Sequence, residues 1–376
     1  TINEGVAGMV HAMWAPDSRH IVTVADFQLH LTVWSLTENE QILYINNPKS
    51  YRSLQFSNCG RFLACLHRKK CKDFLGVYSC KTWETLRFFQ TNTLDSSAVQ
   101  WSADNRYICV MDTSLRFNVE IYTPDGKLLK SIQPYANQLG AKMAMFSPSS
   151  KFLAIGSYDI SVRCLNNLNW HSFFELKFPA LTDGLPANVC VFRELYEHEV
   201  FMEGVEKENS WHQEGYASTS GHMDTPIESR ISSSCMVKAS KGWKFPQPSA
   251  PKKKSKTSGP PATLSLMAWS SNSRFIAIQH SSWKNIVCIL DVASMRLLSV
   301  VELKMPTTCV SWNPMKAELA IACGREKVVL WNFECASWID IPAERFRAHK
   351  IQWSPNGTSL VAMDQKKVCC CKFLYA

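Results

Sequence analysis

The sequence predicts an all-β protein made of repeated four-stranded antiparallel sheets, and three observations support this prediction. A short phrase, in which an aromatic residue precedes a turn-forming group and an apolar run, occurs seven times. The apolar runs are short, alternate with polar residues and are rich in β-branched and aromatic side chains, as strands are. Turn residues interrupt them regularly, which disfavours a helical solenoid of similar period.

The copies of the phrase are spaced at the length of one such sheet. They read WAPDSRHIV, FSNCGRFLA, WSADNRYIC, FSPSSKFLA, WSSNSRFIA, WNPMKAELA and WSPNGTSLV, and begin at Trp14, Phe56, Trp101, Phe146, Trp269, Trp312 and Trp353. Five of the six intervals between these aromatic residues lie between 41 and 45 residues. This is the period of WD-repeat β-propellers, in which each blade is a four-stranded sheet. The sequence therefore predicts a WD-repeat β-propeller with seven recognisable blade repeats.

The strands of each blade can be placed in order along the repeat. The first strand ends at the aromatic residue, and the second follows the turn. The third is an alternating run about twenty residues later, seen in HLTVWSL (30–36), FLGVYSC (74–80), NVEIYTP (118–124), SVRCLNN (161–167), IVCILDV (286–292), KVVLWNF (327–333) and KVCCCKF (367–373). The fourth is an apolar stretch such as TLRFFQT (85–91). The chain ends after the third strand of its last copy, so we expect that blade to lack an outer strand of its own.

One interval is longer than the others and defines the domain boundaries. The step from Phe146 to Trp269 exceeds one period by about 80 residues. We therefore predict blades one to four over 1–180, an insertion over 181–262, and blades five to seven over 263–376. Strand-like residues in the insertion are expected to end with ANVCVF (187–192). The remainder is rich in charged, Ser, Pro and Gly residues, so we predict that it is largely disordered.

Composition limits the remaining classes of function. No stretch of about 18 apolar residues is present, so no membrane span is predicted. The 15 cysteines are an odd number and many lie in strand-like runs, which favours buried free thiols in a reducing compartment. Zinc is the alternative at Cys59, Cys65, His67 and Cys71 and at 369–371. These cysteines lack the paired C-x2–4-C spacing of zinc ligands, so no cofactor is predicted.

The sequence carries no motif of a known catalytic site. It has no Gly-rich phosphate loop, no H-E-x-x-H and no G-x-S-x-G, so no enzymatic activity is predicted. Aspartates recur just after the second strand of several copies, at Asp26, Asp112, Asp159 and Asp364. Such residues either converge on a metal or bond to the backbone of their own turn, and the turn is the favoured interpretation.

Positively charged residues fall between the second and third strands of several copies. The insertion holds ten acidic and ten basic residues, so the net charge of +9 belongs to the blades. Because these loops emerge on one face of a propeller, we predict a basic surface that attracts acidic protein partners. The alternative interpretation is that these residues form a solvated rim that only keeps the protein soluble. The candidate residues are Arg68, Lys69, Lys70, Lys72, Trp283, Lys284, Arg325, Lys366 and Lys367. Aromatic residues do not alternate with these lysines, so nucleic acid is not the expected partner.

Two further groups of residues have a structural and a functional interpretation. The run Lys252, Lys253, Lys254 and Lys256 resembles a nuclear-import signal, and the alternative is a solvated basic linker. The tryptophans Trp211 and Trp243 of the insertion are expected to dock either on the protein's own blades or on a partner. Recurring tryptophans near the fourth strand are expected to pack between blades; these are Trp83, Trp170 and Trp338.

Longer phrases resemble one particular WD-repeat family. They are EGVAGMVHAMWAPDSRHIV (4–22), RKKCKDFLGVYSCKTWETLRFFQTNT (68–93) and SPSSKFLAIGSYDISVRCLNNLNW (147–170). They are similar to the centrosomal WD-repeat proteins whose gene lies antisense to a transcription factor gene of the tumour-protein family. Family members begin about two repeats earlier, so the resemblance implies a chain truncated at its N-terminus. Unlike generic repeats, this chain lacks Gly-His openings and most Trp-Asp endings.

The resemblance implies a role and a location. Members of the family are non-enzymatic scaffolds in the cytoplasm at the centrosome, centriolar satellites and spindle poles. They act with a coiled-coil anchoring protein, and in fungi with a minus-end-directed kinesin, to tether microtubule minus ends and support spindle and cilium assembly. The alternative function is a substrate receptor for ubiquitin ligation or a nuclear scaffold, which the Lys252–Lys256 run suggests.

Overall fold

The chain is described by a computed structural model in two compact units. Residues 2, 8–28, 30–38, 40–46, 48–177, 185–186, 188–196, 234–238, 243–246, 263–343 and 345–373 are described. The first unit comprises 1–177 with 258–264, and the second comprises 178–257 with 265–376.

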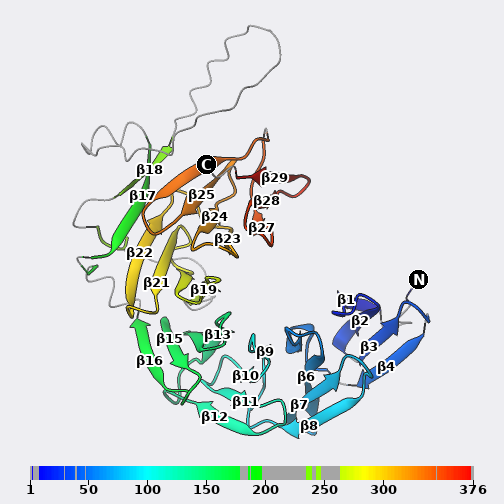
Figure 1. Ribbon diagram of the computed structural model, residues 1–376. Coiled ribbons are helices and arrows are strands. Elements are labelled where there is room, and N and C mark those ends of the chain that lie inside the picture. Colours follow the sequence, from blue (N-terminus) through cyan, green and yellow to red (C-terminus); the bar gives the residue numbers. More distant parts are fainter. Residues whose placement is uncertain are drawn as a thin grey trace, which may run out of the picture. The chain divides into compact units, whose positions relative to one another are not determined.

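The described part of the first unit holds four antiparallel sheets (Figure 1). In each sheet, four strands that follow one another in the chain pair in the same order. The first two sheets consist of β1 (Met9–Trp14), β2 (His20–Ala25), β3 (His30–Ser35) and β4 (Gln41–Asn46), and of β5 (Leu54–Phe56), β6 (Phe62–Lys69), β7 (Lys72–Ser79) and β8 (Thr85–Gln90). The next two consist of β9 (Ala98–Trp101), β10 (Ile108–Met111), β11 (Val119–Tyr122) and β12 (Leu128–Ile132), and of β13 (Ala141–Phe146), β14 (Phe152–Ser157), β15 (Ser161–Asn166) and β16 (Ser172–Lys177).

The second unit contains the three later repeats. Blade five is built from β19 (Leu264–Trp269), β20 (Phe275–His280), β21 (Ile286–Asp291) and β22 (Arg296–Glu302). Blade six is built from β23 (Cys309–Trp312), β24 (Leu319–Ala322), β25 (Lys327–Trp331) and β26 (Ala336–Asp340). Blade seven has three described strands, which are β27 (Lys350–Trp353), β28 (Ser359–Met363) and β29 (Val368–Lys372). The seven predicted blade repeats therefore each form a sheet.

The recurring serine of the phrase fixes the turn between the first and second strands. In the third copy, the Ser102 N–H donates to the Tyr107 carbonyl at 2.9 Å, and the Tyr107 N–H donates to Ser102 Oγ at 2.9 Å. A serine hydroxyl that accepts a nearby backbone N–H stabilises a tight turn. The same pair of bonds joins Ser57 to Phe62, Ser147 to Phe152, Ser270 to Phe275, and Ser354 to Ser359.

The recurring tryptophan at the start of the phrase ties neighbouring blades together. The Trp101 indole N–H donates to the Gln55 carbonyl at 3.1 Å, which lies on the first strand of the preceding blade. In the second unit, Trp312 bonds in the same way to Ala268 and Trp353 to Ser311. Each ring therefore buries apolar surface between two sheets while its polar edge stays paired.

The predicted packing role of the later tryptophans is confirmed, although their places in the blade differ. Trp83 and Trp170 are buried at the turns before β8 and β16, and both adopt left-handed backbone angles. Trp83 meets His20 of the preceding blade edge-on, and Trp170 meets Tyr107 in the same manner. Trp338 lies within β26 itself and packs against the apolar core of blades five and six.

The expectation that strand-like residues in the insertion end at Phe192 is wrong. Strand β17 (Cys190–Tyr196) pairs in parallel with β22, and β18 (Ser234–Lys238) pairs antiparallel with β17, so blade five has six described strands. Acidic residues such as Glu194 are typical of disordered segments. Glu194 is nevertheless buried and pairs with Arg325, which lies far along the chain. Most of the predicted disordered insertion lies outside the described residues, as do Trp211, Lys252, Lys253, Lys254 and Lys256.

Candidate protein-interaction surface

Two kinds of connection reach the same edge of each blade. In a sheet of four successive antiparallel strands, the second and fourth strands run in the same direction. The loop after the second strand and the connector after the fourth therefore leave from one edge, which we call the connector edge. The predicted basic residues lie on the first kind of connection.

In the first unit, three lysines of the predicted surface are exposed and Arg68 is not free. Lys69, Lys70 and Lys72 are exposed at a two-residue turn between β6 and β7, where Lys70 has a φ of 50°. Arg68 Nη1 donates to Asp73 at 3.0 Å and to Asp95 at 2.9 Å. Its charge is therefore paired with Asp73 of the same blade and with Asp95 of the connector that follows it.

Asp73 is the centre of this ion-pair network. Its carboxylate is buried and also accepts hydrogen bonds from the Lys49 ammonium at 2.9 Å and from the Ser96 N–H at 2.5 Å. Burial alone would raise the pKa of Asp73, but the Ser96 N–H and the nearby ammonium outweigh it and lower the pKa. Lys49 also pairs with Asp95. The network joins blade two to the connectors before and after it.

In the second unit, the structure corrects the prediction for Trp283 and Arg325. Trp283 is 7% exposed and is covered by Phe245, and its indole N–H donates to the Pro246 carbonyl at 2.8 Å. Arg325 donates to the Glu194 carboxylate at 2.5 Å. Both residues are engaged by the insertion, which the repeat pattern could not reveal. Lys284, beside Trp283, remains exposed.

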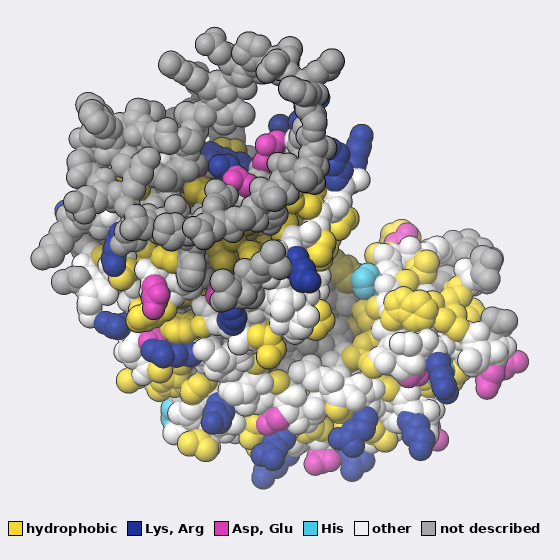
Figure 2. Space-filling view, turned by 45° about the horizontal axis from the view of Figure 1, so that its top comes forward, with side chains coloured by type: hydrophobic (Ala, Val, Ile, Leu, Met, Phe, Trp, Pro, Cys, Tyr) yellow, Lys and Arg dark blue, Asp and Glu magenta, His cyan; other side chains and the backbone are white. Residues whose placement is uncertain are grey.

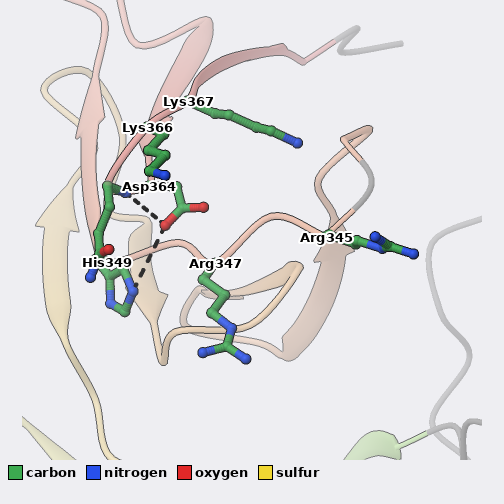
Figure 3. Close-up of a pocket in the computed structure, with 7 residues that line it drawn as sticks. Arg345, Arg347, His349, Asp364, Lys366 and Lys367 are labelled. Carbon is green, nitrogen blue, oxygen red and sulfur yellow. Dashed lines mark hydrogen bonds and ion pairs between the residues drawn. The ribbon is translucent and has the colours of Figure 1, made fainter.

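Lys366 and Lys367 line a basic pocket at the connector edge of blade seven (Figure 3). The pocket has a volume of about 320 Å³. It is lined by Arg345, Arg347, His349, Asp364, Gln365, Lys366 and Lys367. Four cationic side chains and one carboxylate thus line the same pocket. We refer to it as the basic pocket.

Alternating burial positions the two arginines of the basic pocket. Phe346 and Ala348 are fully buried, whereas Arg345 and Arg347 are exposed. An extended segment places successive side chains on opposite sides, so burial of Phe346 and Ala348 turns both guanidinium groups outward. The Ala348 N–H donates to the Arg325 carbonyl at 3.1 Å, which fixes the segment against blade six.

The other wall of the basic pocket is the turn between β28 and β29. The Asp364 N–H donates to the Lys367 carbonyl at 2.8 Å, and the Gln365 N–H donates to Asp364 Oδ1 at 2.7 Å. Figure 3 shows Asp364 facing His349, with 3.9 Å between its Oδ1 and His349 Nε2. Among the described residues, no ion pair is found for Arg345, Arg347 or Lys366. These charges are therefore available to an acidic ligand.

Sequence reasoning missed Arg345, Arg347 and His349 because it considered only the loops between second and third strands. The strand order could have indicated these residues, because the connectors between blades lie at the same edge as those loops. Figure 2 shows other Lys and Arg side chains spread over the visible face among hydrophobic ones. Their shared place in the lining of one pocket therefore distinguishes these residues from the general positive charge.

The recurring aspartates bond to their own turns and sheets or, for Asp112, also to the connector that precedes its blade. Asp112 accepts the backbone N–H groups of Leu94, Asp95 and Thr113. Asp159 pairs with Arg163; burial opposes ionisation, yet this guanidinium and two serine hydroxyls lower the pKa of Asp159 to about 2. Across the described ranges, no three His, Cys, Asp or Glu side chains group as metal ligands would. Within those ranges, no helix has the length and apolar character needed to cross a membrane.

Comparison with known proteins supports the fold. No protein-family model matches the chain. It is 32% identical over 378 residues to mouse WD repeat-containing protein WRAP73, covering 98% of this chain and 77% of that protein. It is 21% identical over 365 residues to a WD repeat-containing protein of Schizosaccharomyces pombe, covering 90% of this chain and 65% of the yeast protein.

A solved structure is similar in fold alone. A chain in the crystal structure of the mitotic checkpoint complex matches with a TM-score of 0.50 and 10% identity, covering 100% of this chain and 96% of the other. Together with the seven blade sheets, these similarities confirm the predicted WD-repeat β-propeller fold. The chain belongs to the WD-repeat protein family that includes WRAP73.

Proposed function

We propose that this protein is a non-enzymatic scaffold that docks an acidic segment of a coiled-coil protein in the basic pocket. Membership of a WD-repeat family supports a protein-interaction scaffold in general. The observation that carries the specific proposal is that Arg345, Arg347, Lys366 and Lys367 line one pocket. Complementary charge accelerates encounter and selects acidic partners.

The cellular part of the proposal follows from the family resemblance. The scaffold acts at the centrosome, centriolar satellites and spindle poles, where it anchors microtubule minus ends with its coiled-coil partner. A minus-end-directed kinesin is the second partner that we propose, and spindle and cilium assembly are the processes served. The 32% identity to WRAP73 along nearly the whole chain supports this assignment.

Charge reversal in the basic pocket tests the docking surface. Arg347→Glu combined with Lys366→Glu reverses two exposed charges without removing buried residues. The matched control is Arg296→Glu with Lys316→Glu, whose exposed side chains lie at the opposite edge of blades five and six. Proximity labelling in dividing cells should lose coiled-coil centrosomal proteins only with the pocket variant. Binding of a purified partner should also weaken as salt rises.

The same experiment separates the proposed role from its alternative. Unchanged labelling by the pocket variant would reject the basic pocket as the docking surface. Wild-type protein that labels ubiquitin-ligase subunits or nuclear proteins, and is absent from spindle poles, would favour the substrate receptor or nuclear scaffold. Fusing residues 248–260 to a fluorescent protein tests whether the Lys252–Lys256 run directs import.

A further inference from the structure

A four-residue piece of the insertion lies across blade five as a ligand would. Residues 243–246 (Trp-Lys-Phe-Pro) belong to no described strand. Phe245 is 5% exposed, and its ring centroid lies 5.1 Å from that of Trp283 and 4.9 Å from that of Trp243. His280 completes the aromatic surface, 4.8 Å from Trp283. The blade supplies Trp283 and His280, and the four-residue segment supplies the other rings.

Two hydrogen bonds fix the orientation of this segment. Trp243 Nε1 donates to Glu302 Oε2 at 2.8 Å, and Trp283 Nε1 donates to the Pro246 carbonyl at 2.8 Å. Glu302 is held in place by Arg193 Nε, which donates to the same oxygen at 2.9 Å. The Glu302 carboxylate is therefore held in position at the connector edge. The segment contributes one indole donor, from Trp243, and one carbonyl acceptor, from Pro246.

These contacts are of a kind that a separate peptide can make. Strands β19 to β22 pair with one another without using residues 243–246. Lys244, between the two aromatic residues, is exposed. The residue before a proline favours an extended backbone, so Phe245–Pro246 suits a linear ligand. Aromatic side chains in desolvated pockets dominate the energy of such interfaces.

We propose that blade five carries a binding site for a short peptide of the form aromatic-x-aromatic-Pro, of which residues 243–246 are the tethered occupant. A partner segment of the same chemistry takes the site when the occupant leaves. The site is built from Trp283, His280 and Glu302 and uses none of the residues of the basic pocket.

The tether explains why the site is closed in the free protein. Four residues separate Trp243 from the end of β18, and sixteen separate Pro246 from Thr263. A short tether gives an effective concentration on the order of millimolar, so a free peptide competes poorly until the occupant is weakened. Weakening the occupant should therefore open the site without altering the blade.

The test uses the whole chain and a fluorescent peptide that spans residues 240–249. Trp243→Ala with Phe245→Ala in the protein removes both aromatic anchors of the occupant. Fluorescence anisotropy should show saturable peptide binding at least about tenfold tighter than to wild type. Lys244→Ala is the matched control. It should leave residues 243–246 in the site, so the affinity for the peptide should equal that of wild type. A peptide with both aromatic residues replaced by Ala should not bind.

A milder variant and a site variant complete the test. Trp243→Phe with Phe245→Leu should give intermediate affinity, and this variant serves if the double-alanine protein fails to fold. Adding Trp283→Leu to the opened protein should abolish binding. The proposal is overturned if an opened variant with wild-type thermal unfolding binds no peptide, or if binding persists equally with Trp283→Leu.

Discussion

Arg325 donates a 2.5 Å hydrogen bond to the buried carboxylate of Glu194, a residue 131 positions earlier in the chain. Glu194 lies on β17 at the outer side of blade five, whereas Arg325 lies between β24 and β25 of blade six. The same carboxylate accepts the Lys304 N–H at 2.7 Å, in the connector between the two blades. One side chain of the insertion therefore joins two blades and their connector.

We expect Glu194→Ala to destabilise the protein strongly. The side chain of Glu194 is fully buried, and its loss leaves the Arg325 guanidinium and the Lys304 N–H without their acceptor. Removing one partner of a fully buried ion pair costs about 3–5 kcal/mol. Because Arg325 is 28% exposed and water can reach it, we expect a cost towards or below the lower end of that range. Glu194→Gln should cost less, because the amide oxygen still accepts one of the two bonds. Denaturant unfolding of the full chain measures both changes.

An exposed ion pair in blade six provides the control for Glu194. Lys327 and Asp340 lie 3.1 Å apart with side chains that are 40% and 66% exposed. Asp340→Ala should change the free energy of unfolding by no more than about 1 kcal/mol. Equal effects of Glu194→Ala and Asp340→Ala would show that the Glu194 contact does not hold the two blades together.

The local repeat could be predicted from sequence because its causes are local. The Ser102 turn uses atoms within five residues, and the Trp101 ring reaches the adjacent blade at a fixed spacing. The sequence indicates strand-like residues only as far as Phe192. The continuation of β17 to Tyr196 and its pairing with β22 could not be predicted, because that pairing joins residues more than one hundred positions apart. Its burial of Glu194 also contradicts what composition suggests for carboxylates.

The candidate surface was predicted only in part, for the same reason. Exposure at the connector edge follows from strand order, and it holds for Lys69, Lys70, Lys72, Lys284, Lys366 and Lys367. Pairing depends on residues from other segments, as with Arg68 and Asp95 or Trp283 and Phe245. A pattern that counts charges cannot tell a free cation from a neutralised one.

We expect Gly140→Ala to destabilise blades three and four. A Cβ built on Gly140 would lie 2.2 Å from the Arg116 carbonyl oxygen, so the backbone itself must move. Gly140 cannot shift freely, because its N–H donates to the Ser114 carbonyl at 2.7 Å. Overpacking against rigid neighbours costs about 1–3 kcal/mol.

Gln138→Ala is the control for this glycine, since Gln138 is exposed in the same connector. It should alter the free energy of unfolding by less than about 0.5 kcal/mol. The close-approach explanation is rejected if Gly140→Ala unfolds at the same denaturant concentration as Gln138→Ala.

We expect stability to fall as the pH drops from about 6.5 towards 4, because two histidines are buried. Desolvation lowers the pKa of His67 and of His280 to about 4. In that window the unfolded chain binds the proton and the folded chain does not, so acid favours unfolding. Above about pH 6.5 both rings are neutral in the folded and the unfolded chain, so these histidines no longer reduce the free energy of unfolding. Each histidine contributes a slope of up to about 1.4 kcal/mol per pH unit.

His67→Gln tests the first of these two groups. Its amide can still bond to the Tyr78 hydroxyl, which lies 3.0 Å from His67 Nε2. The variant should flatten the pH dependence of unfolding between pH 6.5 and 4, and His67→Gln with His280→Gln should flatten it further. A wild-type protein equally stable at pH 7 and pH 4.5 would contradict the prediction.

We expect Cys59 to react with alkylating reagents faster than the buried cysteines. Cys59 is exposed; its slight burial raises the thiol pKa, but Arg61, whose Nε lies 3.5 Å from Sγ, and the Ser57 hydroxyl lower it overall. Burial instead raises the pKa of Cys109 and of Cys164 to about 12, so these thiols remain protonated as well as inaccessible.

Brief iodoacetamide treatment near neutral pH, followed by peptide mass spectrometry, should label Cys59 and leave Cys109 and Cys164 unlabelled until denaturant is added. Arg61→Gln should slow labelling of Cys59 and leave that of exposed Cys71 unchanged. Equal labelling rates at Cys59 and Cys109 in the folded chain would mean that the strands of blade three open far more readily than their complete burial implies.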